Sequence, residues 1–514
     1  MARPSAHPGS LQRSFRRQGL PHLVIQTGPG KLPSHRRKAQ QNLFVLTGLL
    51  LLAVLLEKPL TGLPLRVESL AALAVATIAI IAVVRTSPRG IVSFSSLYVV
   101  VFSVFHFGFT AAVGVGLADL RDAYEVPVWF HHSSAPTAIW LTILGVLAYG
   151  IGASAMLVRQ RDPARAPQDG PQIGNWLTRV GFVVIAACVL FWFGLLISKG
   201  LLLASYYEYR TQKEVPTEYV FLSLAWGLTM LAAGAPTRLR LWGFLIYSVH
   251  VLFAFPLGLR GEVLFPITAA MGVAAARGAR VRTRTALLSI AVLLSLISMG
   301  KGVRDFGLGR LGSLQASANP IRGLVEMGMT LHPVCAAIEW IEGGDAPMYG
   351  ATYWAPFDRA LGRVAPSLGF VRLPAEEDPR VLNKVVQRRV GNVGFSVVAE
   401  AYYNLGPPGV ALVMMLVGGL MGWMDTWPAM PVRGAIAGIV MYAQLYHVRN
   451  NFISIPSMII LGILVILLVV LAARLTSFEK VSEVQGARSA LGAARGRHGR
   501  LTPRHARPGS GTSP

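Results

Sequence analysis

The sequence has few charged residues for its length and few cysteines. Asp, Glu, Lys and Arg make up 14% of its 514 residues, whereas a soluble globular domain contains about 25%. Of its two cysteines, Cys188 lies in an apolar run and Cys335 follows far along the chain. We therefore expect no disulfide bond between them, and two cysteines do not make a metal cluster.

The chain also lacks the motifs of nucleotide-driven and metal-dependent enzymes. It contains no G-x-x-x-x-G-K-S/T phosphate loop, no H-E-x-x-H and no D-x-D pair. No Cys or His pair has the spacing of a metal site. These absences argue against an ATP-driven pump and against a metalloenzyme, and we expect neither a metal nor another cofactor.

Long apolar runs dominate the sequence, which is 53% hydrophobic and has a mean hydropathy of +0.51. The net charge of +24 would suit nucleic acid, but this hydropathy argues against such a partner. A membrane-spanning helix needs about 20 apolar residues, so the runs predict an all-α polytopic membrane protein of about twelve helices. The predicted spans are 42–56, 67–84, 91–117, 136–158, 178–198, 217–234, 240–257, 261–276, 285–300, 406–424, 434–447 and 455–473. The pair around residue 258 could instead form a broken or re-entrant hairpin.

The distribution of Lys and Arg predicts that both termini are cytoplasmic, because cytoplasmic segments near the membrane are enriched in these residues. The first apolar run follows a basic tail too long for a signal peptide, so we interpret it as an uncleaved helix. The predicted organisation is a basic disordered tail (1–41), helices 1–9 (42–300), a large extracytoplasmic loop (301–393), a re-entrant segment with helices 10–12 (394–473), and a second basic disordered tail (474–514). Within the loop, the spacing of apolar residues predicts a helical piece from Pro320 to Ile341.

Several ionisable residues lie at the predicted outer ends of spans, where cations oppose the orientation rule. Arginine suits phosphate because its guanidinium can donate two parallel hydrogen bonds. A carboxylate within an apolar stretch, as at Glu400, is costly and usually functional. Simpler explanations remain: Arg260 could extend its guanidinium to the membrane–water interface, the loop arginines could be solvated or anchor the chain at the membrane surface, and Glu400 could form a structural ion pair, for example with Arg260. The set comprises Arg260, Arg304, Arg388, Arg389, Glu400, His447 and Arg449.

Around these residues the chain resembles the Wzy-type O-antigen polysaccharide polymerases. Four ordered segments between about residues 256 and 450 carry the resemblance. They are Gly-x-Arg at Gly258–Arg260, Glu-x-Gly at Glu326–Gly328, Gly-x-Thr-Tyr at Gly350–Tyr353 with a later Pro366, and Gly-Phe-Ser-x-x-x-Glu-x-Tyr-x-Asn-x-Gly at Gly394–Gly406. The first 240 residues match only in hydropathy, and the basic tails are not part of the pattern.

The resemblance implies an enzyme of the bacterial plasma (inner) membrane that polymerises oligosaccharide repeat units carried on undecaprenyl pyrophosphate. It implies metal-independent glycosyl transfer, with the lipid bilayer as surroundings and a flippase and chain-length regulators as further partners. Carried onto this sequence, Glu400 or His447 would be the catalytic base. The substrate-binding residues would be Arg260, Arg304, Arg388, Arg389, Arg449, Tyr353 and Asn404.

Two other functions remain compatible with the sequence. An O-antigen-ligase-like glycosyltransferase would use the same donor and the same membrane architecture, with another acceptor. A polysaccharide or lipid-carrier transporter would need no catalytic residues, but it would more often show repeated halves and polar residues at mid-bilayer. The segment from Gly394 to Gly406 favours the polymerase.

Overall fold

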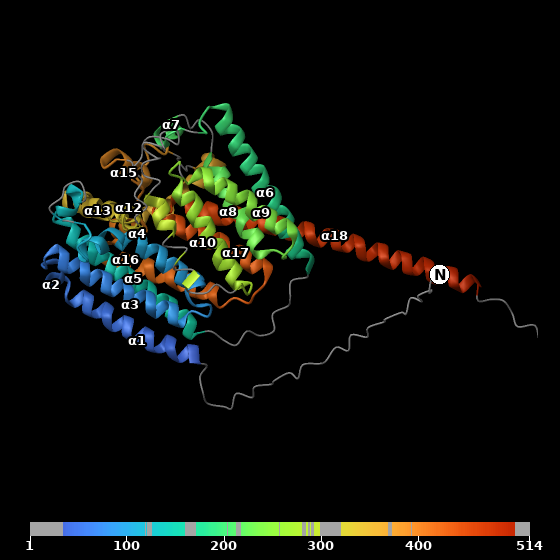
Figure 1. Cartoon of the computed structure of the whole chain (residues 1–514), viewed down its shortest axis with the longest axis horizontal. Helices are drawn as coiled ribbons and strands as arrows, with labels where there is room; N and C mark the ends of the chain where they lie inside the picture. Colours follow the sequence, from blue (N-terminus) through green and yellow to red (C-terminus); the bar gives the residue numbers. More distant parts are fainter. Residues whose placement is uncertain are drawn as a thin grey trace, which may run out of the picture.

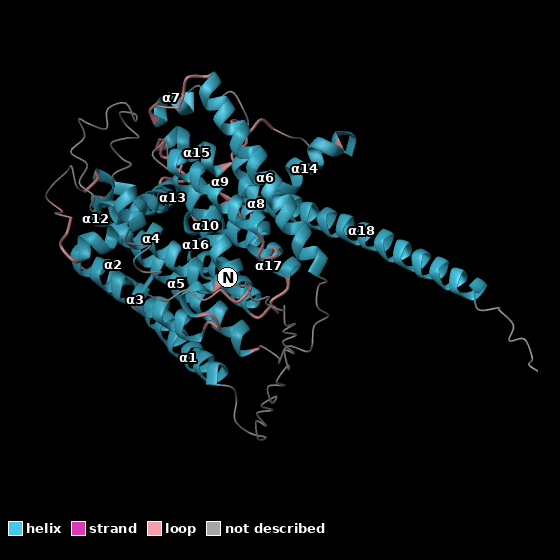
Figure 2. Ribbon diagram, turned by 45° about the vertical axis from the view of Figure 1, so that its right-hand side comes forward, coloured by secondary structure: helices cyan, strands magenta, loops and turns pink. Residues whose placement is uncertain are grey.

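The described part of the chain is helical throughout, with no strand among its residues (Figures 1 and 2). The computed structural model describes residues 34–498, except 119, 121–125, 160–170, 203, 212–216, 256, 280–283, 286–287, 289–291, 299–319, 369–372 and 392. The predicted all-α class is therefore confirmed for these residues.

The long helices follow the predicted apolar runs closely. They are α1 (Ser34–Leu55), α3 (Leu65–Thr86), α4 (Phe94–Gly114), α5 (Ser134–Val158), α6 (Pro171–Ser198), α8 (Thr217–Ala233), α9 (Arg238–Ala254), α10 (Arg260–Ala276), α16 (Val397–Asp425), α17 (Pro431–His447) and α18 (Ile455–His498). The shorter helices are α2 (Glu57–Thr61), α7 (Tyr206–Thr211), α12 (Pro320–Met327), α13 (His332–Glu342), α14 (Ala351–Val364) and α15 (Leu382–Arg389). Short 3-10 turns η1 (Gly90–Val92), η2 (Val128–His131), η4 (Gly328–Leu331), η5 (Pro366–Leu368) and η6 (Phe452–Ser454) complete the elements.

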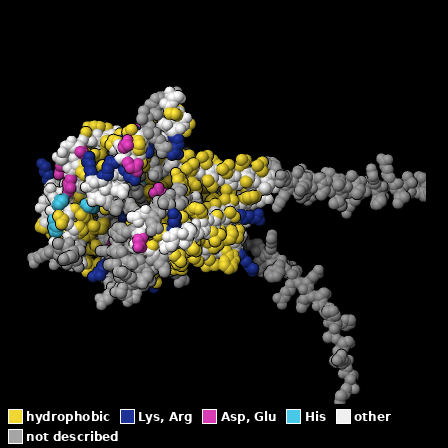
Figure 3. Space-filling model, turned by 90° about the horizontal axis from the view of Figure 1, so that it is seen from above, with side chains coloured by type: hydrophobic (Ala, Val, Ile, Leu, Met, Phe, Trp, Pro, Cys, Tyr) yellow, Lys and Arg dark blue, Asp and Glu magenta, His cyan; other side chains and the backbone are white. Residues whose placement is uncertain are grey.

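Seven described helices are long and apolar enough to cross a membrane, which confirms a polytopic architecture. Helices α8, α9, α10 and α17, with 17 residues each, occupy four further predicted spans but are shorter than that length. The predicted span 285–300 lies only partly within the described residues. The count of about twelve spans therefore stays a prediction. Figure 3 shows a broad apolar area on one part of the visible surface and charged and histidine side chains gathered on another.

The helices form one bundle in which α5 packs against α1, α3 and α16. Gly152 on α5 and Gly418 on α16 explain how close that contact is. A Cβ at either position would overlap the facing backbone, at Met415 and Tyr149 respectively. Small residues allow membrane helices to approach closely and to gain van der Waals contact there. On the other side of the bundle α6 packs against α8 and α9, and α17 lies between α8, α10 and α18.

Helix α16 is broken near its start, where the sequence predicted a re-entrant segment followed by a span. Gly406 has φ 66° and ψ −159°, a backbone conformation open essentially to glycine alone. Pro407 and Pro408 follow and cannot donate backbone hydrogen bonds to the preceding turn. The break separates a short first section, Val397 to Leu405, from the long apolar section.

The segment predicted as the outer loop contains several short helices in its described part. The helical piece predicted from Pro320 to Ile341 is present as α12, η4 and α13. These helices and α15 lie at the end of the bundle away from the projecting end of α18 (Figure 1). Helices α9 and α10 form a hairpin whose turn contains Gly258 at φ 83°. Which side of the membrane the loop faces remains a prediction.

Both predicted tails are partly helical where the structure describes them. Helix α1 begins at Ser34, and α18 continues to His498, well past the predicted end of its span at residue 473. Residues 474–498 include four Ala and four Arg, which have high helix propensity and favour the extension.

Candidate functional site

The side chains of Glu400 and His447 are in contact and form the centre of the candidate site. The Ser396 hydroxyl accepts a hydrogen bond from the backbone N–H of Ala399 at 3.1 Å, so it caps α16 and places Glu400 in the first turn. His447 is the last residue of α17. Glu400 Oε2 lies 3.2 Å from His447 Nε2. The same oxygen accepts a hydrogen bond from the Phe452 backbone N–H at 2.7 Å.

Four buried polar atoms at or near this pair have no hydrogen-bond partner among the described residues. They are Glu400 Oε1, His447 Nδ1, the Tyr353 hydroxyl and Asn451 Nδ2. Glu400 and His447 are 0% and 1% exposed. An unpartnered buried polar atom costs about 1–3 kcal/mol, so such a group suggests that another molecule supplies the missing partners.

Tyr353 reaches the pair from α14 and packs edge-on against Phe452, with ring centroids 5.3 Å apart. Phe452 in turn lies 5.5 Å from the His447 ring. Burial, and after it the charge of Glu400, raises the pKa of Tyr353 well above its usual value. The hydroxyl therefore stays protonated and can donate a hydrogen bond.

Asn404 is fully engaged by the protein itself. Its Nδ2 donates to the Thr352 hydroxyl at 2.8 Å and to the Glu400 carbonyl at 2.7 Å. Its Oδ1 accepts from the Gly350 backbone N–H at 2.9 Å. The sequence predicted a substrate contact here, and that stays a prediction. The observed contacts connect α16 to the start of α14, and through it to Tyr353.

Arg260 is buried at the start of α10 and forms an ion pair with Glu326 of α12. The Nη1–Oε1 distance is 2.6 Å, and the two side chains are 5% and 19% exposed. The sequence suggested Glu400 as an ion-pair partner, but the contact is with the Glu-x-Gly segment instead. Glu326 also lines a small pocket with Met329, Thr330, Gly394 and Arg449. Arg260 therefore pairs with a carboxylate that lines the same small pocket as Arg449.

The other predicted arginines are held by partners within the predicted loop, or lie outside the described residues. Arg389 pairs with Asp345 at 2.5 Å and lies 4.9 Å above the centre of the Trp340 ring. Arg388 donates to the Glu376 carbonyl and is exposed. Arg304 lies outside the described residues. The structure therefore brings together Glu400, His447, Tyr353 and Asn404, and it places Arg388 and Arg389 on the exposed end of α15.

Sequence reasoning missed three contributors to this site. The Phe452 backbone N–H and the Asn383 side chain carry no local signal, because their importance depends on contacts between distant segments. Glu326 stood within a motif that the sequence singled out, but its pairing with Arg260 was not predicted. Among the described residues, no group of three or more His, Cys, Asp or Glu side chains could hold a metal ion.

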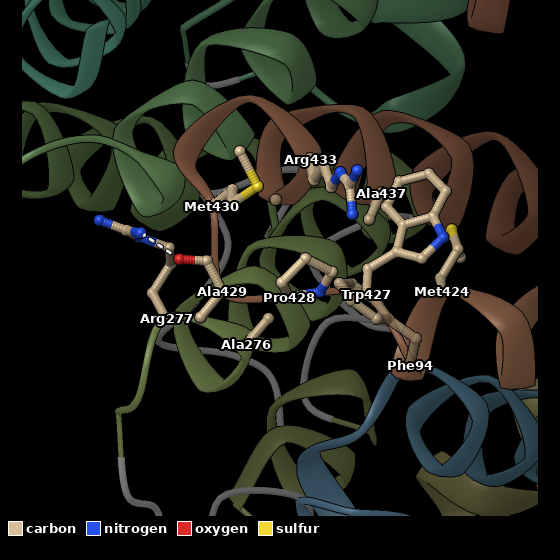
Figure 4. A pocket seen from close by; sticks show the side chains of 11 residues that line it. Phe94, Ala276, Arg277, Met424, Trp427, Pro428, Ala429, Met430, Arg433 and Ala437 are labelled. Atoms are coloured by element: carbon tan, nitrogen blue, oxygen red, sulfur yellow. Dashed lines mark hydrogen bonds between the residues drawn. The ribbon is translucent and has the colours of Figure 1, made fainter. Parts of the chain in front are cut away.

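A second small pocket lies apart from all these residues (Figure 4). It is formed by the ends of α10 and α16, the start of α17 and Phe94 of α4. Arg277 donates to the Ala429 carbonyl at 2.8 Å beside it, and Arg433 lies on its wall. None of the predicted site residues lines this pocket.

Comparison with known proteins agrees with the sequence resemblance. The family model for O-antigen polysaccharide polymerase Wzy matches residues 43–480. The Staphylococcus aureus protein named "Protein CapE" is 28% identical over 217 residues, which cover 42% of this chain and 47% of that protein. The match therefore spans about half the length of that relative. No solved structure matches the chain.

Proposed function

This chain belongs to the O-antigen polysaccharide polymerase Wzy family, and from that premise we propose that it joins lipid-linked oligosaccharide repeat units into a surface polysaccharide. The carrier is undecaprenyl pyrophosphate, and the reaction takes place at the outer face of the plasma membrane. Both termini are then cytoplasmic, as the distribution of Lys and Arg predicts.

The transfer needs one bond to form and one to break. A hydroxyl at the non-reducing end of the next unit attacks the anomeric carbon of the growing chain, and the bond from that carbon to the pyrophosphate oxygen breaks. The hydroxyl proton passes to a base on the enzyme, and undecaprenyl pyrophosphate leaves with the bond's electron pair. The donor is already activated, so the reaction consumes no nucleotide.

The pair of Glu400 and His447 supports this proposal most strongly. A carboxylate accepting from Nε2–H places the proton on that nitrogen and leaves a lone pair on Nδ1. His447 Nδ1 is then the base, Glu400 orients the ring and stabilises the imidazolium that forms, and the Phe452 N–H fixes the carboxylate. The unpartnered Tyr353 hydroxyl can hold a sugar hydroxyl beside the base.

The arginines provide the positive charge that the leaving group requires. Arg260 is buried, and fixed cations in a site that excludes water stabilise developing phosphate charge strongly. Arg449 lines the adjoining pocket and adds a second cation. The proposal assigns the pyrophosphate to this region, with Glu326 holding the Arg260 guanidinium in place.

Deleting the gene tests this function in cells. We expect lipid-linked single repeat units to accumulate and long surface polysaccharide to disappear. The wild-type gene should restore long chains, and a Glu400→Gln gene expressed at the same level should not. Unchanged chain length after deletion would contradict the proposal.

A further inference from the structure

Asn383 of α15 forms hydrogen bonds to two separate backbone segments. Its Oδ1 accepts from the Phe395 N–H at 3.0 Å and from the Asn451 N–H at 3.2 Å. Its Nδ2 donates to Asn450 Oδ1 at 3.1 Å. Because two backbone donors meet the same atom, that atom must be the oxygen, and the orientation of the amide follows.

Both of these segments lead directly into the contacts around Glu400. Phe395 precedes Ser396, the residue that caps α16 and sets Glu400 in its first turn. Asn451 precedes Phe452, whose N–H donates to Glu400 Oε2. One side chain therefore connects the segment that carries the carboxylate with the segment that holds it.

The surroundings of Asn383 are well packed. Leu382 and Val386, on the same helix, are 0% exposed. Phe395 is also fully buried and stacks on Trp340 of α13, with ring centroids 6.1 Å apart. Helix α15 therefore has a fixed position against the start of α16, and Asn383 has a defined place from which to hold both segments.

We infer that Asn383 is a positioning residue for the Glu400–His447 pair. This inference rests on the proposed function. Asn383 touches neither catalytic side chain, and it acts by keeping Phe395 and Asn451 at the spacing that places Glu400 against His447. Helix α15, in the predicted loop, is on this account part of the catalytic framework.

Two substitutions at this position separate positioning from general stability. Asn383→Ala removes all three hydrogen bonds, and we expect kcat to fall by about 10- to 100-fold, because small misplacements of catalytic groups have effects of this size. The KM for the lipid-linked donor should change much less than kcat, because Arg260, the buried cation proposed to hold the pyrophosphate, lies on α10 and not on the segments that Asn383 holds. Asn383→Asp keeps an acceptor for both backbone N–H groups and should recover most of kcat.

Lys384→Ala is the matched control, because Lys384 is the next residue on α15 and pairs with the exposed Glu376 at 3.2 Å. It should leave kcat unchanged. Hydrogen exchange gives a readout that does not depend on activity: Asn383→Ala should speed exchange of the Phe395 and Asn451 amides, and Lys384→Ala should not.

The kinetic and exchange measurements on purified full-length protein in nanodiscs decide the inference together. Loss of kcat with faster exchange at both amides, largely reversed by Asp, supports it. It is overturned if Asn383→Ala keeps its kcat, if exchange at these amides is unchanged, if KM rises by as much as kcat falls, or if Asp restores nothing. Wild-type protein that makes no product of two or more repeat units would instead overturn the proposed function, whatever the exchange data show.

Discussion

Glu400 Oε2 and His447 Nε2 lie 3.2 Å apart, although the two residues are 47 positions apart in the sequence. One sits in the first turn of α16, and the other ends α17. Burying a carboxylate and an imidazole costs free energy of folding unless the two groups interact. Because the two residues are far apart in the sequence, their contact depends on the fold as a whole. It also gives the imidazole a fixed orientation, as general-base catalysis requires.

The first prediction is that Glu400 and His447 act as one unit. Glu400→Gln and His447→Ala should each lower kcat by about 100- to 1000-fold, since either change removes the oriented base. The kcat of the double variant should be only slightly below that of the less active single variant. Initial rates of chain extension by the three purified variants, at matched protein amounts, measure this. Losses that multiply in the double variant would show that the two side chains act independently.

The second prediction concerns Arg260, whose side chain is 5% exposed and whose guanidinium pairs with Glu326. Arg260→Lys keeps the charge but loses the planar, two-pronged geometry, so polymerisation should still fall by about 100-fold. Arg260→Ala should nearly abolish it. Because removing one partner of a buried ion pair destabilises a protein by about 3–5 kcal/mol, Arg260→Ala should also lower the melting temperature.

Glu326→Gln provides the control for this second prediction. This change keeps the shape of the side chain that faces Arg260 and removes its negative charge. The melting temperature of the variant therefore shows how much stability the ion pair supplies. Polymer length for the three variants should be compared at equal amounts of folded protein. Normal long polymer from Arg260→Lys would assign Arg260 a structural role and remove it from the site.

The third prediction concerns the side of the membrane on which the site lies. A reporter active only outside the cytoplasm should be active when fused after Gly343, which follows α13, and silent when fused after Gly278, which follows α10. The charge distribution supports this orientation, because Arg277 and Arg433 lie at ends of α10 and α17 that are predicted to be cytoplasmic. The reverse pattern would place Glu400 and His447 on the cytoplasmic side and would contradict the proposed reaction.

Hydropathy and residue spacing predicted most of the helices. A membrane-spanning segment must form its backbone hydrogen bonds within itself, so it is a helix and appears in the sequence as an apolar run. They also singled out Glu400, since a carboxylate in such a run is costly and usually functional. The hydrogen-bond partners of the site residues could not be predicted in the same way. Asn404 belongs to a motif, yet its amide is occupied by Thr352, Gly350 and the Glu400 carbonyl, which only the folded chain brings together.

The arginines show the same limit of sequence reasoning. Arg260 and Arg389 look alike in the sequence, each beside an apolar segment. In the fold, Arg260 is buried against Glu326, whereas Arg389 is half-exposed and bound to Asp345. Burial depends on which helices pack together, and local spacing does not encode that. The end of α18 departs from the predicted end of its span for another reason: residues of high helix propensity continue the helix beyond the apolar run.

The fourth prediction concerns pH and His332, which stacks on Trp129 with ring centroids 4.8 Å apart. Burial lowers the pKa of His332 from 6.5 to about 4. Between these values the unfolded chain binds a proton that the folded chain excludes, so stability falls as the pH falls through this window. After allowance for partial solvent screening, we expect a loss of about 1–2 kcal/mol.

His332→Phe tests this explanation, because it keeps an aromatic ring against Trp129 and cannot titrate. The apparent melting temperature of the purified protein should be measured between pH 7 and pH 4 for both forms, with the variant losing less than the wild type as the pH falls. Parallel curves would show that other groups cause the acid sensitivity.

The central claim is that this protein itself forms glycosidic bonds between lipid-linked units, without nucleotide or metal. It is tested most directly by reconstituting the purified chain in vesicles with undecaprenyl-pyrophosphate-linked repeat units, a chelator and no ATP, and by measuring product length. The account predicts a ladder of products two or more units long from wild-type protein and single units from Glu400→Gln. Single units from both proteins, with the lipid moved across the vesicle membrane only by the wild type, would contradict it and would indicate a transporter.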